Sequence, residues 1–213
     1  MKTAVRFFAS AVALFAVCLA APAQQEKQPS APSTIASVMN QQLGIVERLF
    51  VGAAEAMPAD KYSFAPTGGD FKGVRTFAQQ VKHVATINYA FYSALLGQDP
   101  PPGVNDKELN GPMNGPDSIQ TKEQIIKYLK DSFAFAHQAT STITADNAAA
   151  VLPKPSVPRP GVPGFFNTRL ILASFDCAHV QDHYGQMVEY LRMNGITPPA
   201  SQGSPPANPS SAK

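Results

Sequence analysis

The chain has 213 residues and a formal net charge of +2, from 17 basic and 15 acidic residues. Two of the basic residues, Lys2 and Arg6, fall in a predicted N-terminal leader, so the rest of the chain carries 15 residues of each sign. A near-neutral chain without a basic run, or basic residues interleaved with aromatic ones, gives no reason to expect nucleic-acid binding.

The first 23 residues have the three regions of a secretory signal peptide. Lys2 and Arg6 open the segment, an apolar run follows from residue 7 to residue 19, and residues 21–23 match an A-x-A cleavage site. We predict export, to the periplasm or the medium, with cleavage after Ala23. The alternative is an uncleaved anchor, which the short apolar run disfavours, so no membrane attachment is expected after cleavage.

Composition then predicts a single domain. Residues 24–33 and 200–213 are polar or rich in Ser, Pro and Ala, which is typical of a disordered linker and a disordered tail. Residues 34–199 lie between them and are enough for one hydrophobic core. Cys177 is the only cysteine of the mature chain, so no internal disulfide can form, and we expect it to be a small buried apolar residue.

Helical periodicity predicts helices over residues 34–57, 71–96, 121–145 and 165–194. Val74 is among the residues expected to face inward from the second helix, and Phe175 and Ala178 are among those of the fourth. The link over residues 98–120 is long enough to cross the length of a helix, which permits the third helix to run parallel to the second. With no strand pattern, the expected fold is all-α, a four-helix bundle with a long crossover between helices two and three.

The last helix carries His179 and His183, which leave the same helix face because they stand four residues apart. This is metal-ligand spacing, and a hydrogen-bond network is the alternative interpretation. Val180 stands where the H-E-x-x-H motif of zinc proteases has its glutamate, so that chemistry is disfavoured. Asp176, one turn earlier, is placed to accept the second N–H of a ligand.

Other polar residues are less specific. Tyr184 and Gln186 are candidates for supporting roles near the histidine pair. His137, in the third helix, is interpreted as a structural or surface residue. His83 lies in the middle of the second helix. A single histidine on a helix is more often a surface or core residue than a metal ligand, so His83 taken alone is a weak candidate.

Three segments together resemble the DinB family of metal-dependent four-helix bundles. They are AMPADKYSFAPTGGDF, FKGVRTFAQQVKHVATINYAFYSALLG and AHVQDHYGQMVEYLRMNGITPP, and the resemblance covers residues 35–199. It implies that His83, His179 and His183 bind one divalent metal ion, with zinc or nickel expected and other positions open. Imidazole ligands also suit copper and iron, so the ligand set does not identify the ion.

The resemblance implies a metal-dependent hydrolase or transferase acting on an unknown small molecule. One alternative is a non-catalytic binding or scaffold protein with a structural histidine site. Another is a thiol-dependent S-transferase, an activity also found in the family. That activity conflicts with export, because low-molecular-weight thiols are mainly intracellular. A homodimer is a further expectation, because such bundles often pair through exposed helix faces.

Overall fold

The computed structural model describes residues 33–101, 104, 111–152 and 167–203. These contain four helices, α1 (Ile35–Ala56), α2 (Phe77–Leu96), α4 (Lys122–Thr140) and α5 (Arg169–Met193), with two short 3₁₀ turns, η1 (Ala59–Lys61) and η2 (Pro199–Ser201). No strand forms within the described ranges, where one isolated bridge pairs Val151 with Thr168. The prediction of an all-α bundle is confirmed. The signal peptide (1–23), nearly all of the linker (24–33) and most of the tail (200–213) lie outside the described residues.

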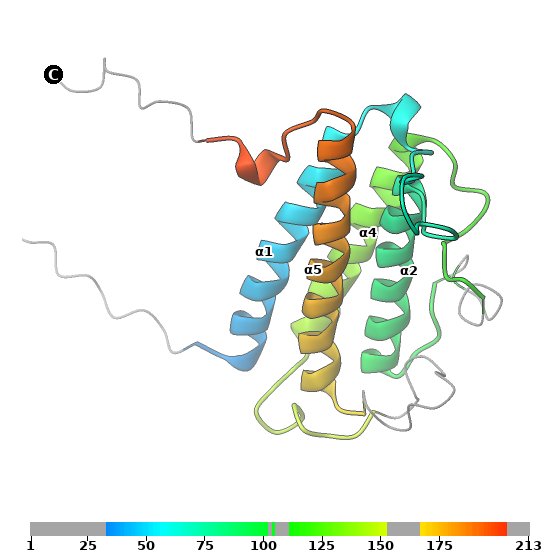
Figure 1. Ribbon diagram of the computed structural model, residues 1–213. Helices are drawn as coiled ribbons and strands as arrows, with labels where there is room; N and C mark the ends of the chain where they lie inside the picture. The colour runs from blue at the N-terminus through cyan, green and yellow to red at the C-terminus, as the bar shows by residue number, and fades with distance from the viewer. Residues whose placement is uncertain (1–32, 102–103, 105–110, 153–166, 204–213) are drawn as a thin grey trace, which may run out of the picture. The chain divides into compact units, whose positions relative to one another are not determined.

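The four helices form a square in which α1 and α2 each pack against both α4 and α5 (Figure 1). Polar contacts fix their directions. Lys122, at the start of α4, donates to the carbonyl oxygens of Glu55 and Met57 at the end of α1, at 2.8 and 2.7 Å, so α1 and α4 are antiparallel. A cation at the C-terminal end of α1 also complements the helix dipole.

Helices α2 and α4 run in the same direction (Figure 1). Thr86 lies beside Tyr128, with 3.1 Å between their hydroxyl oxygens, and two residues further along α2 Asn88 lies 3.1 Å from Ser132. The residue numbers of α2 and α4 therefore increase in the same direction along the bundle, so the two helices are parallel. Two parallel neighbours cannot be joined by a short turn, and the long crossover expected from residues 98–120 provides the connection.

Threonine residues begin all four helices, and three of them form a capping box. At α2, the Thr76 hydroxyl accepts from the Gln79 amide at 3.2 Å, and Gln79 Oε1 accepts from the Thr76 amide at 2.8 Å. The predicted start at residue 71 was therefore wrong by six residues. The left-handed Gly73 (φ 81°) precedes this cap, and Val74, expected to face inward, is 37% exposed.

The other helix ends were predicted with mixed success. α4 ends at Thr140 and not at residue 145. α5 ends at Met193, and Gly195 adopts a left-handed conformation with φ 74°, as expected from the Asn-Gly sequence. Its start is set by the Thr168 cap. On α5, Leu172, Met187 and Leu191 are buried as expected, whereas Ala178 is exposed because Val180 and Cys177 supply that part of the core.

Helix α2 is the most deeply buried of the four, with sixteen of its twenty residues covered. It packs against two helices, and residues 111–120 of the crossover cover a third side. Lys82 in α2 donates to the carbonyl oxygens of Pro116 and Ile119 at 3.0 and 3.2 Å. Polar side chains on α2 therefore lie inside the protein and require partners.

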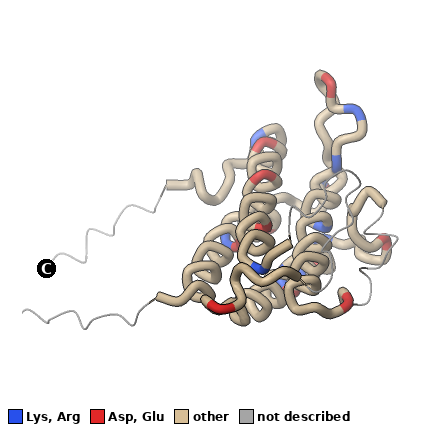
Figure 2. The backbone as a smooth tube through the Cα atoms, turned by 90° about the horizontal axis from the view of Figure 1, so that it is seen from below, with Lys and Arg blue, Asp and Glu red and all other residues tan. Residues whose placement is uncertain are grey.

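Charged residues of both signs are interspersed around the bundle, with no face of a single sign in the view of Figure 2. Among the described residues, no helix combines the length and the apolar character required to cross a membrane.

Candidate metal centre

Three histidine side chains meet between α2 and α5, at the boundary of the hydrophobic core. His83 comes from α2, and His179 and His183 come from successive turns of α5. The Nε2 atom of His179 lies 3.1 Å from the Nε2 atoms of both His83 and His183. One nitrogen from each of the three rings falls within 4.8 Å of the others. His83 and His183 are buried, with 5% and 6% of their surface exposed.

The crossover holds the outer nitrogen of His83. His83 Nδ1 lies 2.7 Å from the carbonyl oxygen of Met113, and because that oxygen only accepts, Nδ1 carries the proton. Met113 has φ 53°, the only positive φ of a non-glycine residue in the described chain. Arg75 holds the residues on both sides of it, donating from Nε to Asn114 Oδ1 at 2.9 Å and from Nη2 to the Pro112 carbonyl at 2.8 Å.

A chain of amides holds the outer nitrogen of His183. His183 Nδ1 lies 2.6 Å from Gln80 Oε1, Gln80 Nε2 donates to Gln186 Oε1 at 2.7 Å, and Gln186 Nε2 donates to Asp182 Oδ2 at 2.9 Å. The carboxylate of Asp182 can only accept, so it sets the orientation of both amides. His183 Nδ1 is consequently a donor, and this relay fixes the tautomer of His183 from the surface.

With both Nδ1 atoms protonated, the Nε2 atoms of neutral His83 and His183 carry lone pairs directed at His179 Nε2. A hydrogen on His179 Nε2 could satisfy one of these two acceptors but not both. A hydrogen-bond network of the three rings alone therefore leaves the Nε2 lone pair of either His83 or His183 without a hydrogen. A cation among the three Nε2 atoms resolves this conflict.

The electrostatic surroundings keep these rings neutral. Burial, and then the positive charge of Arg75, lower the pKa of His83 to about 3. The same two causes lower the pKa of His183 to about 4, although the Asp182 carboxylate opposes the shift. Metal binding requires neutral imidazole, and these rings are in that form throughout the physiological range.

The spacing also fits a small cation. In a tetrahedral zinc site with Zn–N bonds of about 2.0–2.1 Å, ligand nitrogens stand roughly 3.3 Å apart, close to the two separations of 3.1 Å here. The described part of the chain brings only these three ligand atoms together. Phe91 and Phe175 lie with ring centroids 6.4 Å from that of His179 and form an apolar wall beside it.

Asp176 does not accept a hydrogen bond from a histidine, so the role expected for it from the sequence was wrong. Its carboxylate is fully buried. When the Asn88 amide is oriented with its nitrogen toward Asp176, that nitrogen donates to Asp176 Oδ1 at 3.2 Å. Burial raises the pKa of Asp176 to about 7, and the Tyr92 hydroxyl works against that shift. Gln186, by contrast, has the supporting position expected for it, and Tyr184 is a half-buried packing residue.

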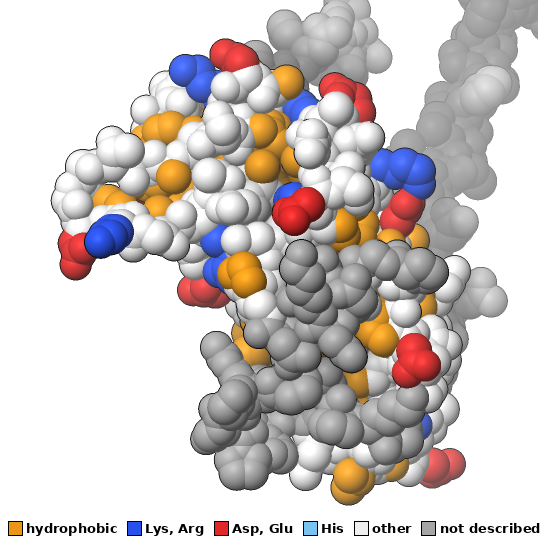
Figure 3. Space-filling view, turned by 90° about the vertical axis from the view of Figure 1, so that its right-hand side faces the viewer, with side chains coloured by type: hydrophobic (Ala, Val, Ile, Leu, Met, Phe, Trp, Pro, Cys, Tyr) orange, Lys and Arg blue, Asp and Glu red, His pale blue; other side chains and the backbone are white. Residues whose placement is uncertain are grey.

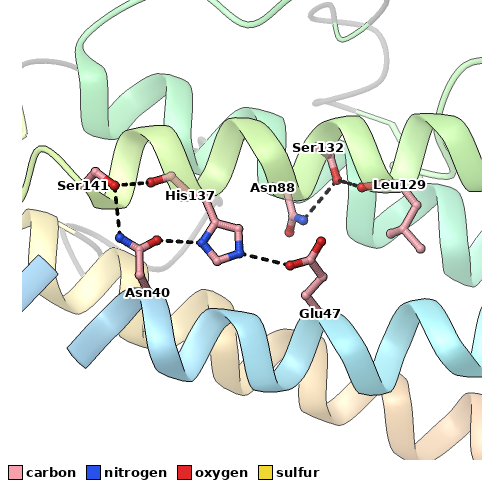
Figure 4. A network of polar contacts seen from close by, with 7 residues as sticks. All are labelled: Asn40, Glu47, Asn88, Leu129, Ser132, His137 and Ser141. Carbon is pink, nitrogen blue, oxygen red and sulfur yellow. Dashed lines mark hydrogen bonds and ion pairs between the residues drawn. The ribbon is translucent and has the colours of Figure 1, made fainter. Parts of the chain in front are cut away.

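His137 and Cys177 have the structural roles expected for them. His137, in α4, faces Asn40 Oδ1 at 2.6 Å and Glu47 Oε2 at 3.0 Å from α1, with Ser141 completing the contact (Figure 4). Cys177 is buried in the core, and burial raises its thiol pKa to about 12. Such a thiol has little thiolate character and is a poor nucleophile.

Sequence reasoning missed three residues that hold the ligands: Gln80, Met113 and Arg75. Gln80 had a detectable signal, because a polar residue three positions before His83 shares its helix face. Met113 had no detectable signal in the sequence, because it contributes a backbone carbonyl from an irregular link.

The comparison with protein families agrees with the all-α fold. Residues 42–187 match the model of the DinB superfamily. No curated protein matches the chain significantly. The match covers more than half of the chain, including all three histidines, and the protein belongs to the DinB superfamily.

Proposed function

We propose that the protein binds one divalent metal ion, zinc or nickel, through His83, His179 and His183, and that it is a metal-dependent hydrolase or transferase acting on a small molecule. One observation carries the proposal: the two outer nitrogens of His83 and His183 are fixed as donors, so three Nε2 atoms converge with lone pairs directed inward. A divalent ion held by three imidazoles supplies a Lewis acid.

Neighbouring residues orient two of the three histidine rings, keep both of these neutral and shield the third from water on one side. Met113 and Gln80 orient the rings of His83 and His183. Arg75 and burial keep both rings neutral. Phe91 and Phe175 shield His179 from water on one side. Three ligands without a fourth among the described residues favour an open catalytic position over a closed structural site.

Elemental analysis of the tag-free mature protein tests metal binding. We expect about one equivalent of a transition metal per chain, either as purified or after incubation with zinc or nickel at neutral pH. A folded protein that takes up neither ion under these conditions contradicts the proposal.

A second measurement separates a catalytic centre from a structural one. Cobalt-substituted protein reports its coordination through visible absorption bands, and added azide enters only an open position. We expect a saturable change in these bands. An unchanged spectrum means that the coordination sphere is closed, and the scaffold alternative then holds.

We also propose that the protein is exported after cleavage at Ala23, on the basis of the leader composition. Intact mass of the protein recovered from the cell envelope or medium tests this, and retention of residues 1–23 contradicts it. A homodimer stays a prediction, and a monomer mass by light scattering rejects it.

A further inference from the structure

A second polar site lies beside the metal centre. A cavity of about 500 Å³ opens between residues 73–75, residues 112–114 of the crossover, the start of α2 and the facing part of α5. Four side-chain amides and one guanidinium line it, from Gln79, Gln80, Asn114, Gln186 and Arg75. None of the described residues that line the cavity has a carboxylate, and together they contribute one positive charge and a set of neutral hydrogen-bonding groups.

Arg75 is held rigidly in this wall. Its Nε and Nη2 atoms donate to Asn114 Oδ1 and the Pro112 carbonyl, and its own carbonyl accepts from the Tyr190 hydroxyl at 3.0 Å. Both acceptors of the guanidinium are uncharged, and no described carboxylate forms an ion pair with it. Burial lowers the pKa of Arg75, because a cation withdrawn from water without a counter-charge is unfavourable.

The contacts of Arg75 occupy one edge of the guanidinium. They use the Nε–Nη2 edge and leave the edge formed by Nη1 and Nη2, with two parallel N–H groups. That fork matches the two oxygens of a carboxylate, and such a bidentate pair is among the strong hydrogen-bonded pairs of proteins. Neighbouring amides can donate to the same group or bind other polar atoms of a ligand.

We propose that this cavity binds the carboxylate of a small molecule through the Nη1–Nη2 edge of Arg75. Lys and Arg side chains are visible on the face of the molecule that Figure 3 shows. A volume of about 500 Å³ is in the range of small-molecule sites.

The cavity and the metal centre share walls. Gln80 lines the cavity and holds His183. Pro112 and Asn114 line it and flank Met113, which holds His83. A carboxylate at Arg75 therefore contacts the groups that orient two of the three rings. If the proposed metal site is correct, the two binding events are linked, and linkage is reciprocal.

Binding is tested first in metal-free mature protein, so that the result does not depend on the metal proposal. Succinate is titrated into ¹⁵N-labelled protein at constant ionic strength, with the uncharged succinamide as its matched probe. We expect saturable shifts of the Arg75 Nε–H and Gln80 amide signals with succinate and none with succinamide. Equal shifts with both probes, or none with succinate, overturn the proposal.

Two further arms identify the group recognised. Arg75→Lys keeps the charge but removes the fork, and we expect at least about tenfold weaker succinate binding, whereas Arg192→Lys, at an exposed arginine paired with Glu189, leaves it unchanged. If Arg75→Lys does not fold, the comparison of probes in the parent protein still decides. Inorganic phosphate binding more tightly than succinate overturns the assignment of a carboxylate.

The linkage is tested by measuring zinc affinity with and without saturating succinate. We expect a change of about fivefold or more in the zinc Kd. Succinate binding with an unchanged zinc Kd removes the linkage but keeps the carboxylate site, and absence of zinc binding contradicts only the proposed metal function.

Discussion

The bundle places histidines in two different environments. In the contact between α1 and α4, Asn40 and Glu47 occupy both ring nitrogens of His137, so neither is left for another partner (Figure 4). In the contact between α2 and α5, protein acceptors occupy only the outer nitrogens of His83 and His183. Their inner nitrogens face a third ring at 3.1 Å.

The partners of the two ring nitrogens therefore distinguish a structural histidine from a candidate metal ligand. The presence of a histidine in a helix does not. Both ring nitrogens of His137 have protein partners. In the α2–α5 cluster the inner nitrogens of His83 and His183 face a ring nitrogen of His179, and we propose that a cation lies among the three. Substitutions at the two places should therefore have different consequences.

The largest expected effect is on metal affinity. His83→Ala and His179→Ala each remove one of three ligands, and we expect zinc affinity to fall on the order of several hundred-fold, because roughly 10–16 kcal/mol of binding is shared among the ligands of a structural zinc site. His137→Ala is the matched control and should bind zinc like the parent. Competition with a chromophoric chelator measures the zinc affinity of all three variants. Equal losses of zinc affinity in His137→Ala and His83→Ala would contradict the difference between a structural histidine and a candidate ligand.

A smaller effect is expected when the relay to His183 is interrupted. Asp182→Asn allows the amides of Gln186 and Gln80 to reverse, so His183 loses its fixed tautomer. We expect about a tenfold loss of zinc affinity, and recovery in Asp182→Glu. The ¹⁵N shifts of the His183 ring in metal-free protein report the tautomer directly.

The control for the relay is Glu189→Gln, another exposed acid of α5, which pairs with Arg192. It should alter neither the zinc Kd nor the ring shifts. An Asp182→Asn protein with parental affinity and parental ring shifts would show that the relay does not position His183.

The pH dependence of stability distinguishes the buried acid beside the cluster from the cluster itself. The pKa of Asp176 is raised from 3.8 to about 7, so the folded protein holds its proton more tightly and loses stability as pH rises between these values. His83 and His183 have lowered pKa values and contribute the opposite slope. Asp176→Asn removes only the first contribution.

We therefore expect the free energy of unfolding of metal-free Asp176→Asn, relative to the parent, to increase from pH 4 to pH 8 by on the order of a few kcal/mol. Urea unfolding at several pH values measures this difference. Asp131→Asn, at an exposed acid paired with Lys127, is the control and should show no comparable trend. A constant difference between Asp176→Asn and the parent would contradict the raised pKa.

The smallest expected effect is on the stability contributed by His137. His137→Ala removes its contacts with Asn40 and Glu47 at a site about one-third exposed, and we expect a loss of about 1 kcal/mol in the free energy of unfolding. Chemical denaturation measures it. A loss as large as that of a buried core substitution would mean that the contact organises α1 and α4 more than its exposure indicates.

Much of the fold followed from periodicity. The number of helices, the long crossover and the end of α5 at Asn194–Gly195 are local or topological features that apolar spacing and turn residues encode. The start of α2 was missed because Phe71 and Val74 continue the apolar pattern. The capping box of Thr76 and Gln79 decides that boundary through backbone hydrogen bonds, which apolar periodicity does not report.

The candidate site was only partly predictable. The four-residue spacing of His179 and His183 indicated a shared face, and the family resemblance added His83. The contact of the Met113 carbonyl with His83 and the hydrogen bonds of Arg75 to Pro112 and Asn114 could not be predicted from the sequence. Both depend on the path of the crossover. Asp176 was misassigned because a place one turn from His179 does not reveal that Asn88 and Tyr92 lie against it.

The crossover, α4 and the link that follows it separate the two halves of the candidate metal centre along the chain. His83 and His179 are 96 positions apart, and closing a loop of that length opposes early contact by about 4 kcal/mol. We therefore expect the three nitrogens to come together only when α2 and α5 dock, late in folding. If the proposed ion binds at that stage, we expect it to leave the folding rate unchanged and to slow unfolding, so its main contribution would be a longer lifetime of the native state.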